Sequence, residues 1–244
     1  MKTLNLLTLT VVAGSLLTLT AQAGILGSPH DFHSRSWNND PSDPATVCSV
    51  CHTPHHADTV SGPLWGHTPI SASGWQMYAN GVSPGANIKY TPAAAPTGSS
   101  LACLSCHDGS IAVNAYGSVA SSEYITNGAA ISEGSKNLTH SHPISFNYQA
   151  LVGTGPTQDK WLNDSVNTLV LTPDANSPGF IAGNDMHIKG FLLDQQGNLE
   201  CSSCHDVHNQ EGSPYNIVNN PHLVKINGTA GGVGSLLCRS CHNK

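Results

Sequence analysis

The chain has 244 residues, of which only 10% are charged and 39% are hydrophobic, and its formal net charge is −6. Nine Lys and Arg against fifteen Asp and Glu disfavour a nucleic-acid-binding protein, which uses basic patches to displace counterions from phosphates. Beyond the amino terminus, no apolar run approaches the roughly 18 residues that a membrane-spanning helix needs. Cys and His are abundant instead, with eight and fourteen copies. A functional interpretation has to explain these two counts.

Residues 1–23 have the pattern of a secretory signal peptide. Lys2 gives a short positive region, residues 4–19 form an apolar run, and Ala21 and Ala23 supply the small residues of a cleavage site. We therefore expect export, with a mature chain of residues 24–244.

All eight cysteines fall into C-x-x-C pairs, and each pair is followed directly by a histidine. An even number of Cys in an exported protein first suggests disulfides, but this regular spacing is typical of covalent c-type haem attachment. In chain order, the four motifs are Cys48 and Cys51 with His52, Cys103 and Cys106 with His107, Cys201 and Cys204 with His205, and Cys238 and Cys241 with His242.

The motif has a chemical reason. Two thiols separated by two residues reach the two vinyl groups on one edge of a haem, and the next residue places an imidazole against the iron. A redox dithiol or half of a zinc site uses C-x-x-C alone and does not require a histidine after every pair. The sequence therefore predicts four covalently attached haem c groups, and we number the sites 1 to 4.

Four irons need eight axial ligands, and the motif histidines provide four. Met77 and Met186 are the only methionines after the predicted cleavage site, whereas ten further histidines are available. We therefore expect two histidines at every iron, which gives a lower reduction potential than His/Met ligation. Six-coordinate iron exchanges electrons but leaves no position for a substrate, so the interpretation is electron transfer and not enzyme catalysis.

Four histidines are the candidates for the second ligand: His30, His55, His142 and His208. His55 and His208 each follow a motif histidine by three residues, where a side chain turns away from its own iron toward a neighbouring one. His142 precedes a proline that fixes an extended backbone, and His30 lies just after the predicted cleavage site. Several choices stay open: His56 is one residue from His55, His33 and His140 compete with nearby candidates, and the pairing of ligands with irons is undetermined. Ordinary surface or hydrogen-bonding roles are expected for His67, His187 and His222.

The C-H-x-x-H pattern divides the chain into two related halves. It indicates duplicated di-haem units at about residues 30–110 and 200–244, separated by a haem-free insert at about 111–200. Within the insert we expect a strand at 165–172, and a hairpin formed by 189–194 and 199–203 around the turn at 195–198. Short helical turns carry the motifs. The predicted fold is mostly irregular coil, with short helical turns and a few short β-strands, wrapped around four haems that supply the missing core.

Several segments resemble those of exported bacterial multihaem cytochromes c with a doubled C-x-x-C-H motif, and most of all OmcE-type tetrahaem cytochromes. They are Cys51–Ala57, Gly62–Trp65, Cys103–Gly109, Ser141–Phe146 and Cys201–His208. The resemblance implies a homopolymer, namely an extracellular filament with a continuous haem chain. It also implies that one axial histidine can come from the adjacent subunit, and His30 is the candidate. The nearby His33, where relatives more often have a small polar residue, leaves the ligand of this arm open.

The leading functional hypothesis is low-potential electron transfer to external acceptors, at the cell surface or outside it, with other redox proteins as partners. A soluble periplasmic tetrahaem shuttle is the first alternative. A multihaem reductase with one open iron position is the second.

Overall fold

The computed structural model describes residues 24–38, 46–58, 62–78, 93–116, 122–126, 128–132, 134–170, 187–209, 222–226 and 235–243. The predicted signal peptide and Met186 lie outside the described residues.

Turns, bends and irregular coil make up most of the described chain, and its regular elements are short. The helices are α1 (Thr46–Ser49), α2 (Gly98–His107), the 3₁₀-helix η1 (Gln149–Leu151), α3 (Ile188–Phe191), α4 (Cys201–Cys204) and α5 (Leu236–Cys241). The strands β1 (Phe146–Asn147) and β2 (Asn198–Leu199) pair antiparallel, with Phe146 opposite Leu199. Each Cys pair has at least one member in a helix. Helices α2, α4 and α5 contain both cysteines of their motif, whereas α1 contains only Cys48.

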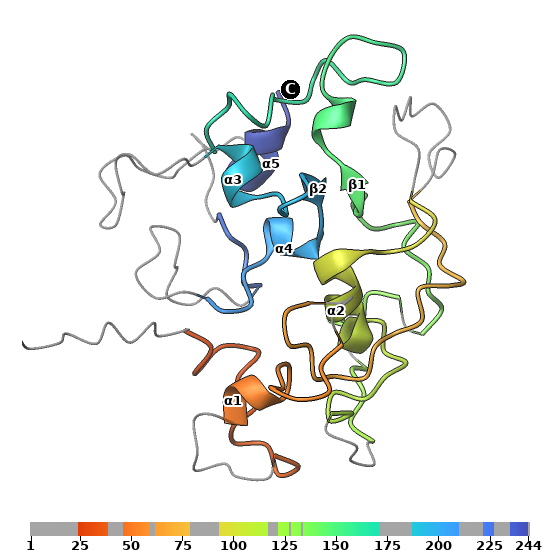
Figure 1. Ribbon diagram of the computed structural model, residues 1–244, viewed down its shortest axis with the longest axis vertical. Coiled ribbons are helices and arrows are strands. Elements are labelled where there is room, and N and C mark those ends of the chain that lie inside the picture. Colours follow the sequence, from red (N-terminus) through yellow and green to blue (C-terminus); the bar gives the residue numbers. More distant parts are fainter. Residues whose placement is uncertain are drawn as a thin grey trace, which may run out of the picture.

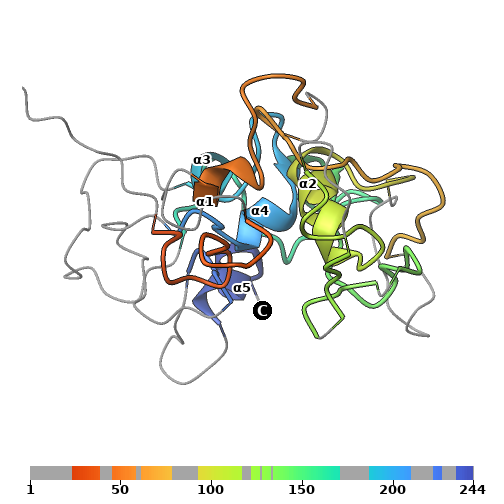
Figure 2. The same cartoon turned by 90° about the horizontal axis from the view of Figure 1, so that it is seen from below.

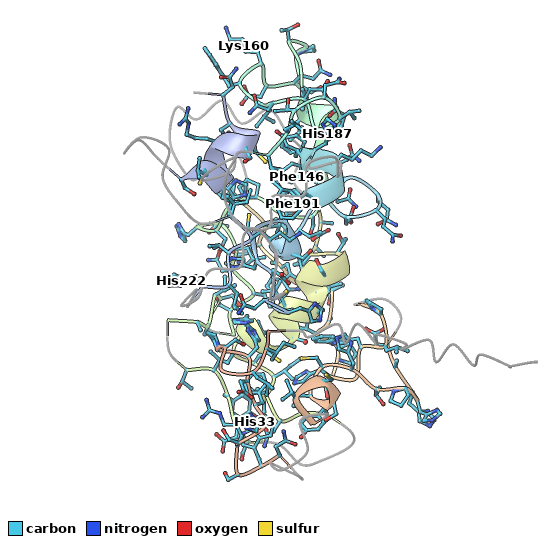
Figure 3. The ribbon with its side chains drawn as sticks, turned by 90° about the vertical axis from the view of Figure 1, so that its left-hand side faces the viewer. His33, Phe146, Lys160, His187, Phe191 and His222 are labelled. Carbon is cyan, nitrogen blue, oxygen red and sulfur yellow. The ribbon has the colours of Figure 1, made fainter. Side chains whose placement is uncertain are left out.

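The four motif helices follow the long axis of the molecule (Figure 1). Helix α1 lies near one end and α5 near the other, with α2 and α4 between them. Seen from the α1 end, α4 lies near the centre and α2 to one side (Figure 2). The amino-terminal arm belongs to the α1 end, where His33 lies, whereas Lys160 lies at the opposite end (Figure 3). The attachment motifs are thus spread along the molecule in chain order.

Two small apolar clusters supply the protein core. One contains Trp75, Met77 and Leu104 next to α2, so Met77 packs within this apolar cluster. The other is built around α3 and β2 and contains Tyr148, Val170, Ile188, Leu192, Leu193, Leu199, Ile226 and Leu236. Phe146 and Phe191, which lie close together in Figure 3, pack against this second cluster.

The strand expected at 165–172 is wrong for the residues that are described. The Asp164 carboxylate accepts the amides of Val166 and Asn167 at 2.8 and 3.1 Å, and this side-chain cap bends the backbone into a turn. Only Leu169 forms a β-bridge in this stretch, with His187. Residues 171 and 172 lie outside the described residues.

The expected hairpin is also wrong, although its turn is present. Gly197 takes a φ of 81°, and Asp194 accepts the amide of Asn198 at 2.7 Å, so the chain does reverse here. Residues before the turn form α3 instead of a strand. Strand β2 pairs with β1, a partner about fifty residues away that local sequence does not reveal.

No helix among the described residues has the length and apolar character needed to cross a bilayer.

Candidate haem-binding sites

All eight cysteines are free thiols in this structure. The second cysteine of each motif points inward. Burial raises the pKa of Cys51 and Cys204 to about 11, and of Cys106 and Cys241 to about 12. Cys48 and Cys238, the first cysteines of the outer motifs, are exposed.

Neighbouring motifs approach one another in chain order. Besides burial, the nearby Cys51 contributes to the raised pKa of Cys106, and Cys238 contributes to that of Cys204. Cys103 and Cys201 are within hydrogen-bonding contact, with the pKa of Cys103 raised by this contact. Site 1 therefore adjoins site 2, site 2 adjoins site 3, and site 3 adjoins site 4.

Three of the motif histidines are oriented by backbone carbonyl groups. The Nδ1–H groups of His52, His107 and His205 donate to the carbonyl oxygens of Pro63, Ala129 and His222, at 2.9, 2.8 and 2.8 Å. A carbonyl oxygen only accepts, so each Nδ1 must carry the proton. The lone pair is then on Nε2, which is the arrangement that metal-ligating histidines adopt in proteins.

The carbonyl at site 1 belongs to a short segment that pairs with the motif, and we call such a segment a clamp. In the site-1 clamp, residues 63–66, the Leu64 carbonyl accepts the amide of Thr53 at 2.8 Å, and the Gly66 amide donates to Cys51 O at 2.8 Å. Leu64 has a φ of 52°, an uncommon backbone conformation for a residue other than Gly. This turn directs the preceding Pro63 carbonyl toward His52.

Sites 3 and 4 repeat this arrangement. At site 3 the clamp is residues 222–225. The Leu223 carbonyl accepts the amide of Asp206 at 2.7 Å, and the backbone amide of Lys225 donates to Cys204 O at 2.8 Å. Leu223 has a φ of 49°. At site 4 the clamp is residues 161–163, with Asn243 N to Trp161 O at 2.7 Å and Asn163 N to Cys241 O at 2.9 Å. Site 2 differs, since Ile131 donates to His107 O. Sequence reasoning assigned no role to the clamps, although Gly62–Trp65 is among the segments that carry the resemblance, and the clamps of sites 1 and 3 share a Leu at 64 and 223.

Three motif histidines each face one of the candidate second ligands. The rings of His52 and His208 are nearly parallel, with centroids 6.2 Å apart and planes 17° apart. His107 and His30 are 5.9 Å apart at 53°, and His242 and His142 are 6.3 Å apart at 69°.

These separations match two imidazoles that share one metal ion. A metal lies about 2 Å from a ligating His nitrogen, and a ring nitrogen lies about 1 Å from the ring centre. Two imidazoles on opposite sides of one metal therefore place their centroids about 6 Å apart. Tilted and edge-to-face contacts between aromatic rings fall in the same range, so the distinguishing feature of these pairs is that each joins one motif histidine to one candidate second ligand. The residues present thus fit the iron of a haem at sites 1, 2 and 4.

The protonation of the second ligands also suits metal binding. Burial, with smaller contributions from His107 and His205, lowers the pKa of His30 to about 4, so its ring is neutral and keeps a lone pair. Its buried Nδ1 makes no hydrogen bond within the described chain. His142 Nδ1–H donates to the Pro143 carbonyl at 2.8 Å, which leaves Nε2 free.

Site 3 lacks such a pair among the described residues. His205 and the remaining candidate, His55, are both exposed, and neither ring faces another imidazole in the part of the chain that the structure describes. Within the described residues, one motif histidine and one candidate second ligand thus lack a facing imidazole.

The other histidines have different surroundings. His67 is buried, and its Nε2 contacts the carbonyl oxygens of Ala112 and Val113 at 3.0 and 3.2 Å, in line with the hydrogen-bonding role expected for it. His33 pairs with the Asp31 carboxylate, and His56 and His140 are exposed.

The described residues contain no group of three or more His, Cys, Asp or Glu side chains arranged to bind a metal ion on their own. Comparison with known proteins gave no match, whether with family models, with curated proteins or with solved structures.

Proposed function

We propose that this protein carries electrons through four covalently attached c-type haems, each with a histidine on both faces of the iron. The observation that carries the proposal is the pairing of His52, His107 and His242 with candidate second ligands at ring separations of 6.2, 5.9 and 6.3 Å. Chance contact between histidines does not explain why each pair joins one motif histidine to one of the four candidates.

The chain's own groups would do three things. The Cys thiols of each motif fix the porphyrin edge covalently, and paired imidazoles hold both axial positions. The carbonyl groups of Pro63, Ala129 and His222 hold the ring tautomer and orientation. A bound haem supplies one-electron exchange at its iron, at a low potential when both axial ligands are His. Since paired imidazoles leave no open position, substrate chemistry is disfavoured at sites 1, 2 and 4.

The order of the motifs supports a single path along the molecule. The motif helices follow the long axis (Figure 1), and cysteines of successive sites adjoin one another. Electrons would then pass from site to site without a mobile carrier.

We further propose that the subunits join head to tail in an extracellular filament. His208 follows His205 by three residues and faces His52 of site 1. His55 follows His52 by the same three residues, so it would face His205 of an adjacent copy. One such contact supplies the second ligand at site 3, and because it is heterologous it can repeat into an open filament when the rotation between subunits does not close a ring. His30, the candidate expected for this role, lies beside His107 of its own chain, so the role passes to His55.

The haem content has a direct test. Intact mass of the native protein should exceed the cleaved polypeptide by four haems, and the ferric protein should be low-spin throughout. Fewer than four haems would overturn the proposal.

The assembly is tested by microscopy of native wild-type protein and of two neighbouring variants. His55→Ala should abolish filaments and leave one iron in four with a new, cyanide-binding high-spin signal, whereas His56→Ala should assemble normally. A wild-type monomer with four low-spin irons would favour the periplasmic shuttle. A wild-type monomer that binds cyanide or nitrite at site 3 would favour a reductase, because His205 then faces an open position.

A further inference from the structure

Glu200 is a buried acidic residue at the junction of the two central motifs. It directly precedes α4, which carries site 3, and only 1% of its surface is exposed. Its carboxylate accepts hydrogen bonds from the start of α2, the helix of site 2, and from the turn before β1. Thr97 Oγ1 donates to Oε1 at 2.7 Å, Ser145 Oγ donates to Oε2 at 2.9 Å, and Ser100 Oγ also donates to Oε2.

The direction of these hydrogen bonds indicates an ionised carboxylate. Ser100 Oγ accepts the amide of Cys201 at 3.0 Å, and Ser145 Oγ accepts the amide of Thr97 at 2.9 Å. Since those N–H groups occupy hydroxyl lone pairs, the hydroxyl protons point at Glu200. A carboxylate accepts every one of them, whereas a protonated acid would bring a further proton that needs its own acceptor.

The charge at Glu200 has no cationic partner. No Lys or Arg of the described residues forms an ion pair with it, and the acidic Asp194 is the charged side chain that acts on it. Burial raises the pKa of Glu200, and the hydroxyls of Ser100, Thr97 and Ser145 oppose this rise. The backbone also adopts an uncommon conformation to hold the cluster, because Ser145 has a φ of 63°.

Both central attachment sites lie next to this charge. Cys201 is the next residue, and its thiol is within hydrogen-bonding contact of Cys103 on α2. Ser99 and Ser202 connect the same two helices through their hydroxyls at 2.6 Å. The carboxylate therefore lies where the edges of the site-2 and site-3 haems would be attached.

We propose that Glu200 is a buried anion that holds the reduction potentials of the two central haems below the values they would have without it. This inference rests on the proposed haem attachment and adds a tuning role to it. A fixed negative charge stabilises ferric over ferrous iron, because reduction adds another negative charge nearby. Its effect is large in a buried site, where solvent screening is weak.

The test is a spectroelectrochemical titration of purified Glu200→Gln, which keeps the side-chain size and removes the charge. Two of the four midpoint potentials should rise by about 59 mV each, which corresponds to roughly a tenfold change in the equilibrium constant of a one-electron reduction. The other two should stay at their wild-type values. Ser99→Ala is the matched control, since it removes a contact between the same helices without touching Glu200, and its four potentials should be unchanged.

Haem counting by intact mass separates this inference from the proposed function. If wild type carries four low-spin haems but all potentials of Glu200→Gln match wild type, Glu200 has no tuning role. Equal shifts in Ser99→Ala and Glu200→Gln would also overturn the proposal, because they would reflect helix packing alone. Should Glu200→Gln fail to attach four haems, Ser145→Ala takes its place. Loss of one donor changes the charge distribution around Glu200, so the same two potentials should change while the other two stay at their wild-type values, and four unchanged potentials contradict the inference.

Discussion

Replacing His208 by Ala isolates one axial ligand and should change site 1 alone. His208 is exposed, and its ring centroid lies 6.2 Å from that of His52 with planes 17° apart. Its removal therefore loses little packing and deletes one imidazole of one pair. One iron in four loses its second ligand, and about a quarter of the low-spin ferric signal should be lost. The orientation of two imidazole planes sets the anisotropy of a low-spin iron. The lost component should therefore be that of near-parallel rings, distinct from the 69° pair of His142 and His242.

Electron paramagnetic resonance of the frozen ferric protein measures both the amount and the kind of signal lost. His140→Ala is the control, because His140 is exposed and close in sequence to His142, and its spectrum should equal that of wild type. A His208→Ala spectrum that keeps all four low-spin components would refute the pairing of His208 with His52. Loss of the component from near-perpendicular rings would refute the link between ring angle and site.

Two further predictions concern stability. Tyr148→Phe should lower the free energy of unfolding by about 1–3 kcal/mol in a denaturant titration. The buried Tyr148 hydroxyl donates to the carbonyl oxygens of Asn163 and Cys241 at 2.9 and 3.0 Å, and so links the site-4 motif to its clamp. An unchanged midpoint of the titration would contradict that link. Acid should destabilise the protein partly through His67, whose pKa burial lowers from 6.5. A depressed pKa means that its contribution is fully present above about pH 6.5 and is lost as the pH falls toward the folded-state value. In thermal melts between pH 7.5 and 5, the His67→Asn variant should therefore lose less stability on acidification than the wild-type protein. Equal losses of stability in the two proteins would exclude a contribution from His67.

The strongest inferences from the sequence rest on residues that lie close together in the chain. A C-x-x-C-H motif is complete within five residues, so its chemistry can be inferred without a fold. His208 and His142 were candidates because of local features, a C-H-x-x-H pattern and a following proline, and the structure places both beside motif histidines. Whether these pairs bind iron stays a prediction.

Contacts between distant segments could not be predicted in this way. Which ring faces His52 depends on packing across more than 150 residues, and the carbonyl groups of Pro63 and His222 have no side-chain signature at all. Glu200 looks like an ordinary acidic residue in the sequence, and only the fold surrounds it with hydroxyls. The strand expected at 165–172 failed for a related reason, because the cap from Asp164 outweighed the β-branched residues that follow it.

A density map of the native protein, at a resolution that separates axial ligands, tests the central claim most directly. We expect four haems joined to the four Cys pairs, with His52–His208, His107–His30 and His242–His142 on opposite faces of three irons. The fourth iron should lie between His205 and His55 of an adjacent copy. A motif without haem density, or iron at sites 1, 2 or 4 with a face not occupied by these histidines, would contradict it.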